Sequence, residues 1–161
     1  NKSPYQERFS AYSKRRVLSP LINTEFDIKS FADLAFQTDD FKSYYKDKTI
    51  IYFWNSYDSK NDQSFNLLNE IDQKTKGEIA IITFNASVNQ QKHAEFVSKY
   101  ATLYNFHLKE PNNKTLQELA KKYDLTILPK AFLLDKKGTI LDVDSNLDVL
   151  VEDILNNLPN N

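Results

Sequence analysis

Apolar and polar positions fall in blocks that divide most of the chain into strands and helices. Two runs of nearly continuous apolar sequence, at residues 49–55 and 78–85, are typical of strands buried on both faces. Between these runs the apolar residues recur at helical spacing, which predicts a helix over residues 62–76. Strand, helix and strand in this order form a βαβ unit, whose crossover is expected to be right-handed.

The second half of the chain predicts three more helices and a β-hairpin. The helices are indicated by apolar residues on one helical face, and they cover residues 89–104, 116–123 and 147–158. A brief extended piece is expected at residues 105–109. Two further apolar runs, 131–134 and 139–143, flank a turn that ends in Gly138, and a glycine in that place suits a type I turn with a bulge.

The first 37 residues are predicted to form an extension that packs on a domain of residues 38–161. Residues 4–16 have the pattern of a short amphipathic helix with basic residues near its carboxyl end. A docking arm is the simpler interpretation of this helix, and a partner-binding or membrane-surface helix is the alternative. Residues 21–37 follow no single period, so we expect an irregular or short-strand region there. A helix start is indicated at residues 38–40.

Composition and charge narrow the classes of function. The 161 residues include 21 basic and 22 acidic side chains, interspersed along the chain, so no basic footprint for nucleic acid is present. Cysteine is absent, which excludes disulfides, thiolate nucleophiles and thiolate metal sites together. No apolar run approaches the roughly 20 residues that a transmembrane helix needs. Methionine is also absent and the sequence starts at Asn1, so we expect a mature or excised form.

The loop after residues 49–55 is the first place to look for chemistry, because α/β folds place ligands at the carboxyl ends of strands. Asp58, Asp62 and a histidine would supply oxygen and imidazole ligands for a divalent cation. However, His93 and His107 lack ligand-like spacing and are expected to be solvated surface residues. Hydrolysis by the Asp58 and Asp62 carboxylates is also disfavoured, because the sequence indicates no apolar pocket that would raise the pKa of either group. We therefore predict no metal and no cofactor.

Two separated motifs resemble thioredoxins of the TlpA and ResA type. Phe53-Trp54-Asn55-Ser56-Tyr57 resembles the strand end that precedes the cysteine pair of this family. Ile127-Leu128-Pro129, followed by residues 131–140, resembles its cis-proline, strand and turn. Residues 96–125 resemble the helix, short strand and helix between the motifs. The resemblance covers about residues 38–158 and implies a thioredoxin-like α/β fold, with a central mixed β-sheet flanked by helices and an N-terminal helical extension.

The chain departs from this family where the redox chemistry would lie. Asp58 and Asn61 stand at the two positions where the family has its cysteines, so no disulfide can form between them. Ser64 stands where related enzymes often carry a proton-handling acid. The resemblance therefore implies a degenerate thiol-disulfide oxidoreductase fold that is not an enzyme.

The resemblance also implies an arrangement for the second motif. Pro129 is expected to be cis and to face the loop at Asp58. Lys130 follows this proline, where relatives usually have a small polar residue. We predict that its amine approaches Asp58 or Asp62 and neutralises a carboxylate near the amino end of the following helix.

A binding function is the leading hypothesis for the former active-site groove. Trp54, Tyr57 and Leu128 are expected to cluster there with Asp58 and Lys130, and redox-active relatives receive an extended peptide in this groove. The simpler interpretation is that these side chains cap the core. We predict a protein-interaction or scaffolding module for a protein or extended peptide, and the resemblance alone implies a bacterial periplasm or cell envelope. The alternatives are carboxylate or metal-assisted chemistry in the same groove, or a non-catalytic domain of a larger envelope protein.

Overall fold

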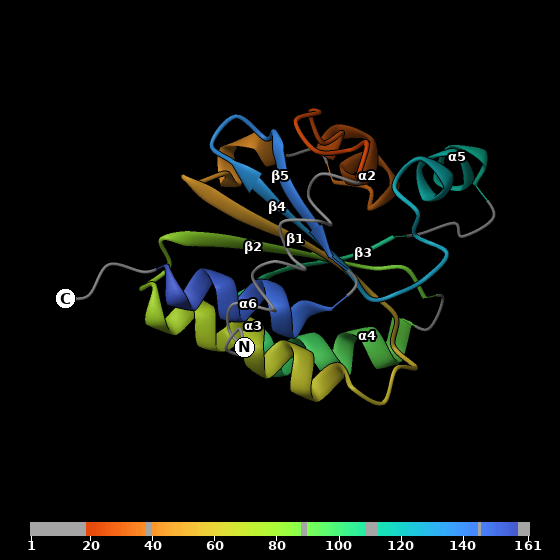
Figure 1. The fold of residues 1–161 in the computed structure, drawn as a ribbon. Helices are drawn as coiled ribbons and strands as arrows, with labels where there is room; N and C mark the ends of the chain where they lie inside the picture. The colour runs from red at the N-terminus through yellow and green to blue at the C-terminus, as the bar shows by residue number, and fades with distance from the viewer. Residues whose placement is uncertain (1–18, 38–39, 88–89, 109–112, 145, 158–161) are drawn as a thin grey trace, which may run out of the picture.

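A computed structural model describes residues 19–37, 40–87, 90–108, 113–144 and 146–157 (Figure 1). The predicted helix at residues 4–16 lies outside the described residues. At the centre is a five-stranded sheet with the strand order β3-β2-β1-β4-β5. The strands are β1 (Lys48–Trp54), β2 (Ile79–Asn85), β3 (Tyr104–His107), β4 (Lys130–Asp135) and β5 (Ile140–Asp144).

The sheet is mixed, and its parallel half places three strand ends together. β1 pairs in parallel with β2, and β2 pairs in parallel with β3. The register sets Trp54 opposite Asn85 and Asn85 opposite His107, so these three residues form one row across the carboxyl ends of the strands. β4 runs antiparallel to both β1 and β5, as the predicted hairpin requires.

Helices cover both faces of the sheet (Figure 1). On one face lie α3 (Asn61–Lys74), α4 (Gln90–Val97) and α6 (Leu147–Asn156), and on the other lie α2 (Ile28–Leu34) and α5 (Lys114–Lys122). Two short 3-10 helices, η1 (Phe41–Tyr44) and η2 (Ser98–Tyr100), complete the described elements. This arrangement confirms the predicted α/β class with a mixed sheet between helical layers.

The alternation of side chains along β1 divides the core into two parts. Ile51 and Phe53 pack with α2 and α5, whereas Tyr52 and Trp54 pack with α3 and α6. All four side chains are fully buried, because β1 is the central strand of the sheet. The apolar run that predicted this strand therefore supplies both halves of the core.

The expectation of an irregular or short-strand region at residues 21–37 is wrong for its second half, where α2 forms. The α2 helix begins after Asp27, whose carboxylate accepts hydrogen bonds from the Ser30 backbone N–H (3.2 Å) and hydroxyl (2.7 Å). Ile28 and Phe31 are buried one turn apart. Seven residues span fewer than two helical turns, which is too short a window for the 3.6-residue period to emerge from the sequence.

The segment before α2 runs along the outer edge of β5. Glu25 forms an isolated antiparallel bridge with Thr139. The Asn23 N–H donates to Ile140 O, and the Ile140 N–H donates to Thr24 O, both at 2.8 Å. Phe26 then enters the core and stacks on Phe31, with ring centroids 5.5 Å apart. Residues 23–31 are thus part of the packed structure, and whether a domain boundary lies at residue 37 stays a prediction.

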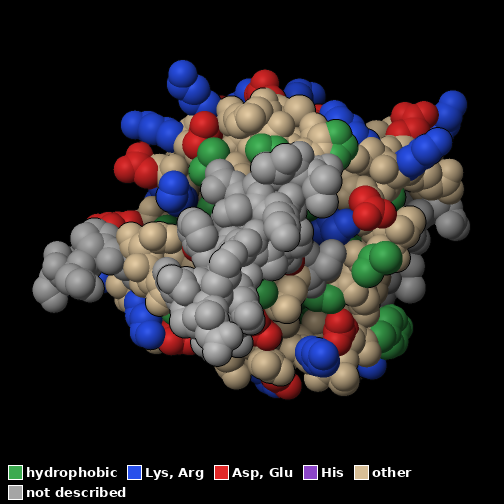
Figure 2. Space-filling model, in the orientation of Figure 1, with side chains coloured by type: hydrophobic (Ala, Val, Ile, Leu, Met, Phe, Trp, Pro, Cys, Tyr) green, Lys and Arg blue, Asp and Glu red, His purple; other side chains and the backbone are tan. Residues whose placement is uncertain are grey.

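Side chains of both charges are distributed over the surface. The face seen in Figure 2 shows basic and acidic side chains interspersed around the described residues, with no large patch of one sign. This distribution agrees with the near-neutral net charge of -1. Among the described residues, no helix is both long and apolar enough to cross a membrane.

Candidate functional site

The loop between β1 and α3 uses its polar side chains to fix its own backbone. Asn55 Oδ1 accepts a hydrogen bond from the Tyr57 N–H (2.9 Å), and Asp58 Oδ1 accepts one from the Lys60 N–H (2.9 Å). Asn61 Nδ2 donates to the Asn55 carbonyl at 2.7 Å. Asp58 and Asn61, which the resemblance aligns with the family's cysteines, therefore help to hold the loop in place.

The predicted groove residues differ in their exposure. Trp54 is fully buried (0% exposed) and packs edge-on against Phe65, with ring centroids 4.9 Å apart. Tyr57 is 61% exposed. Leu128 is half-buried and packs against the core. Trp54 therefore caps the core, and Tyr57 is the aromatic residue of this loop that reaches the surface.

The prediction that Lys130 approaches Asp58 or Asp62 is wrong. Lys130 is 5% exposed, and its amine donates to the Asp124 carboxylate (3.0 Å) and to the Asp124 carbonyl (2.6 Å). The reason is the alternation of side chains along β4, which places Lys130 on the same face as Phe132, under α2 and α5. Asp58 and Asp62 lie at the start of α3, which covers the opposite face. The hydrogen bond and charge of Lys130 lower the pKa of the Asp124 carboxyl.

The proline of the second motif lies directly before β4. The Leu128–Pro129 peptide bond is cis. β4 pairs with β1 in a register that sets Lys130 opposite Phe53, so the loop before β4 and the loop after β1 lie at the same edge of the sheet. The first of these loops exposes Ile127, which is 64% accessible. That Pro129 faces Asp58 stays a prediction.

The expectation that the histidines are solvated and unrelated is wrong. His93 of α4 and His107 of β3 stack with ring centroids 4.6 Å apart and an angle of 15° between the rings, and both are half-buried. His93 also stacks on Trp54 at 5.9 Å and 24°. The three rings form a column at the carboxyl ends of the parallel strands, between the sheet and α4.

A hydrogen-bond network fixes the protonation of His93. Asn85 Oδ1 accepts hydrogen bonds from the Ser87 backbone N–H (2.9 Å) and hydroxyl (2.6 Å), and because a backbone N–H can only donate, this sets the orientation of the amide. Asn85 Nδ2 then donates to Ser56 Oγ (2.8 Å) and to His93 Nδ1 (3.1 Å). His93 Nδ1 is therefore an acceptor, and the neutral ring carries its proton on Nε2.

Burial and the neighbouring ring oppose a charge on His93. Desolvation and the nearby His107 lower the pKa of His93 from 6.5 to about 4. His107 Nε2 contacts the Ser87 carbonyl, which can only accept, so this nitrogen carries the His107 proton. His93 is thus held in a defined neutral tautomer, and His107 donates from Nε2 to the Ser87 carbonyl.

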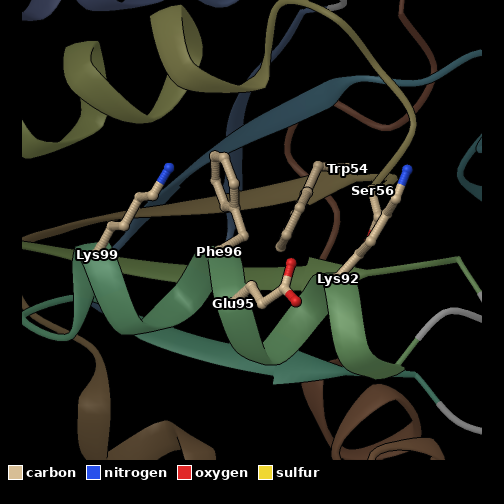
Figure 3. Close-up of a pocket in the computed structure, with 6 residues that line it drawn as sticks. All are labelled: Trp54, Ser56, Lys92, Glu95, Phe96 and Lys99. Carbon is tan, nitrogen blue, oxygen red and sulfur yellow. The ribbon is translucent and has the colours of Figure 1, made fainter.

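A pocket opens beside this column, between α4 and the start of the loop after β1 (Figure 3). Its volume is about 310 Å³, and it is lined by Trp54, Ser56, Lys92, Glu95, Phe96 and Lys99. The Lys92 amine lies 4.6 Å from the centre of the Tyr57 ring, a cation–π distance. Among the described residues, no three His, Asp or Glu side chains gather as a metal site would require.

The fold and the positions of these loops define a thioredoxin-like protein. A family model described as thioredoxin-like matches residues 46–140, which is more than half of the chain. The chain therefore belongs to the thioredoxin-like family, and the sequence-based assignment is confirmed. A comparison with curated proteins gives no match.

Solved structures of thiol-disulfide oxidoreductases share this fold. A thiol-disulfide oxidoreductase from Bacteroides fragilis has 18% identity and a TM-score of 0.55, over 69% of this chain and 81% of that one. A putative thiol:disulfide interchange protein DsbE from Chlorobium tepidum has 20% identity and a TM-score of 0.56, over 71% and 82% of the two chains. A thioredoxin-like protein from Parabacteroides distasonis has 28% identity and a TM-score of 0.52, over 70% and 82%. The present chain is similar to these proteins but has no cysteine.

Proposed function

We propose that this chain is a redox-inactive thioredoxin-like domain that binds a protein partner. The binding surface is the edge of the sheet formed by the strand ends, at the loops that follow β1 and precede β4. One observation carries the proposal: without cysteine, the two loops at this edge still expose the large side chains of Tyr57 and Ile127. Large exposed aromatic and aliphatic side chains are typical anchors of protein interfaces.

An extended segment of a partner is the occupant that this edge suits. In redox-active relatives of this fold, an extended peptide is expected beside the same two loops. Backbone hydrogen bonds give such a peptide affinity, and side-chain contacts such as those offered by Tyr57 and Ile127 give specificity. The family assignment is compatible with a bacterial periplasm or cell envelope, and a scaffolding role there, alone or as a domain of a larger envelope protein, is part of the proposal.

The alternative of non-thiol chemistry has no supporting observation among the described residues. The Asp58 carboxylate accepts a hydrogen bond from the loop backbone. The histidines that would assist it bond to Asn85 and to the Ser87 carbonyl instead. Binding without catalysis is therefore the function that the geometry supports best.

Affinity capture with matched variants tests the proposal. The chain is used as bait in an envelope extract of the bacterium that encodes it, and the retained partner is quantified by mass spectrometry. We expect Tyr57→Ala and Ile127→Ala each to lower retention about tenfold, the loss typical of an interface anchor. Phe36→Ala is the control, because Phe36 is a 58% exposed aromatic residue that follows α2 and belongs to neither of these loops. Equal retention by all variants would refute the proposed surface.

A further inference from the structure

Helix α4 covers Trp54 with few contacts of its own. None of the described residues of α4 is fully buried. The helix reaches Trp54 through the half-buried rings of His93 and Phe96, which lie 5.9 and 5.1 Å from the indole between ring centroids. A helix with little buried surface is among the first elements of a protein to open locally. Its attachment to the sheet therefore depends strongly on these rings.

The His93 ring makes a polar contact between α4 and the strand ends. Its Nδ1 accepts from Asn85 Nδ2 at 3.1 Å. Protonation of His93 at Nδ1 would turn this acceptor into a donor. It would then face the Asn85 Nδ2 donor, and two donors cannot form a hydrogen bond. Rotation of the Asn85 amide cannot relieve this, because the Ser87 N–H and hydroxyl both donate to Asn85 Oδ1. A charged His93 therefore destabilises the closed position of α4.

We propose that α4 is an acid-sensitive latch: protonation of His93 breaks its hydrogen bond with Asn85, and α4 moves away from the sheet and exposes Trp54. The opening also removes the α4 wall of the pocket that Trp54, Phe96 and Lys99 line (Figure 3). This inference concerns the opposite face of the molecule from Lys130 and stands without the proposed partner.

The direction of the pH dependence follows from the two states. In the closed state the pKa of His93 is lowered to about 4, whereas a solvated histidine has an ordinary value of 6.5. The open state therefore takes up the proton first, and opening is favoured as the pH falls from 6.5 towards 4. Above pH 6.5 both states are neutral at His93, and the latch stays closed.

Other titratable groups near His93 have to be separated from it. His107 faces it from β3, and Lys92 and Glu95 flank it on α4. β1 and β2 contribute side chains that do not titrate, namely Trp54, Ser56 and Asn85. Glu95→Gln and His107→Gln are therefore informative controls, since each removes one titrating neighbour and keeps His93.

The composition makes the latch directly measurable, because Trp54 is the only tryptophan and the chain has two histidines. Acrylamide quenching of Trp54 fluorescence is expected to rise several-fold between pH 6.5 and 4 while the far-UV circular dichroism keeps its native shape. His93→Gln is expected to abolish the rise, and Glu95→Gln is expected to retain it. His107→Gln should move the rise in quenching to lower pH, because it removes a neighbour that lowers the pKa of His93 in the closed state and so weakens the drive to open.

Titration of the two imidazole rings by NMR in the unsubstituted chain keeps the test independent of how the variants fold. One ring is expected to titrate well below 6.5, together with the change in Trp54 quenching. An unchanged quenching rise in His93→Gln would overturn the latch, as would quenching that stays constant to pH 4. Loss of the far-UV signal at the same pH would show global unfolding and would also refute it.

Discussion

The position of Lys130 on its strand determines which acceptors its amine can reach. The pleat directs its stem under α2 and α5, and its amine then meets the carbonyl just beyond the carboxyl end of α5, where a cation is favoured. The exposed Asp124 carboxylate adds a second acceptor. The ion pair is therefore local to this face and leaves the loop at Asp58 unaffected.

Substitution of Lys130 separates the contributions of its stem and its charge. Lys130→Ala is expected to lower the free energy of unfolding by about 2 kcal/mol, because it removes buried methylene groups and leaves a cavity. Lys130→Met keeps most of the buried stem, and replacing a buried charge by an apolar group of similar size costs less than about 1 kcal/mol. Urea denaturation measures both. Equal losses would show that the hydrogen bonds of the amine, and not its packing, carry the stability.

The two glycines offer a matched pair at the scale of one residue. Both have positive φ, +73° for Gly77 and +85° for Gly138. A Cβ on Gly138 would lie 2.7 Å from Cε2 of Tyr45, whereas one on Gly77 would have its nearest neighbour at 3.7 Å. Gly77→Ala is therefore expected to cost about 1 kcal/mol of stability through backbone strain alone.

Gly138→Ala adds a steric clash to the same strain. We expect a loss of about 2–3 kcal/mol, because the ring of Tyr45 must move as well. Thermal unfolding of the two variants side by side gives the difference. Similar melting temperatures would mean that the Tyr45 ring adjusts without cost.

At the scale of elements, the sequence predicted those whose apolar patterns are long or continuous. β1, α3 and β2 lie within one or two residues of their predicted ranges, because β2 and all of β1 after Lys48 are buried and α3 spans nearly four turns. The helix predicted at 89–104 was too long: α4 ends at Val97, and β3 begins at Tyr104. Its weak apolar face agrees with the absence of fully buried residues in α4.

The candidate site was predicted less completely than the fold. The loop at Asp58 was found from the motif before it, but the column of Trp54, His93 and His107 was missed. A signal was available, since Asn85 ends one predicted strand and His107 lies in the brief extended piece predicted at residues 105–109, and parallel strand ends meet at one edge. The stacking itself depends on where α4 packs, and no local pattern fixes that.

The start of α3 gives a test of how much of the family's active-site frame remains. The Asn61 N–H donates to the Asp58 carbonyl at 3.3 Å, which closes a four-residue turn. Cα atoms at the ends of such a turn lie within about 7 Å, and a disulfide spans about 4.4–6.8 Å. The double substitution Asp58→Cys, Asn61→Cys is therefore expected to form a disulfide under oxidising conditions.

With dithiothreitol as the electron donor, this double variant is also expected to reduce insulin at a measurable rate, because a thiol near the start of a helix is readily ionised. Asp58→Cys alone is the control, since one thiol cannot complete the exchange. The unsubstituted chain should be inactive in the same assay. Free thiols that persist in oxidised glutathione would show that the loop no longer has the geometry of the family.

For the whole molecule, the segment before β1 matters as much as the sheet. Phe31 of α2 packs against Phe53 of β1, Phe84 of β2 and Tyr123 next to α5, at 4.8, 5.6 and 5.8 Å between ring centroids. One side chain of the predicted extension thus connects two strands and the α5 end. The core on this face cannot be complete without it.

Phe31→Ala tests this connection. We expect the free energy of unfolding to fall by about 3–5 kcal/mol, the cost of removing a fully buried aromatic ring. Phe36→Ala, two residues after α2, removes an exposed ring and should change stability by less than about 0.5 kcal/mol. Guanidinium denaturation compares the two. A small loss for Phe31→Ala would mean that α2 is an appendage and that the domain is stable without it.

The bridge between residues 23–26 and β5 has a consequence for solubility. An edge strand with free backbone groups is a template on which other chains can add, and proteins limit such growth by covering the edge. Here the segment that delivers Phe26 to the core also occupies the backbone groups of Ile140 and Gly138. If this segment were detached, β5 would gain a free edge at the same time as the core lost an aromatic ring. Aggregation on storage would therefore accompany any weakening of the segment, and would be an early sign of it.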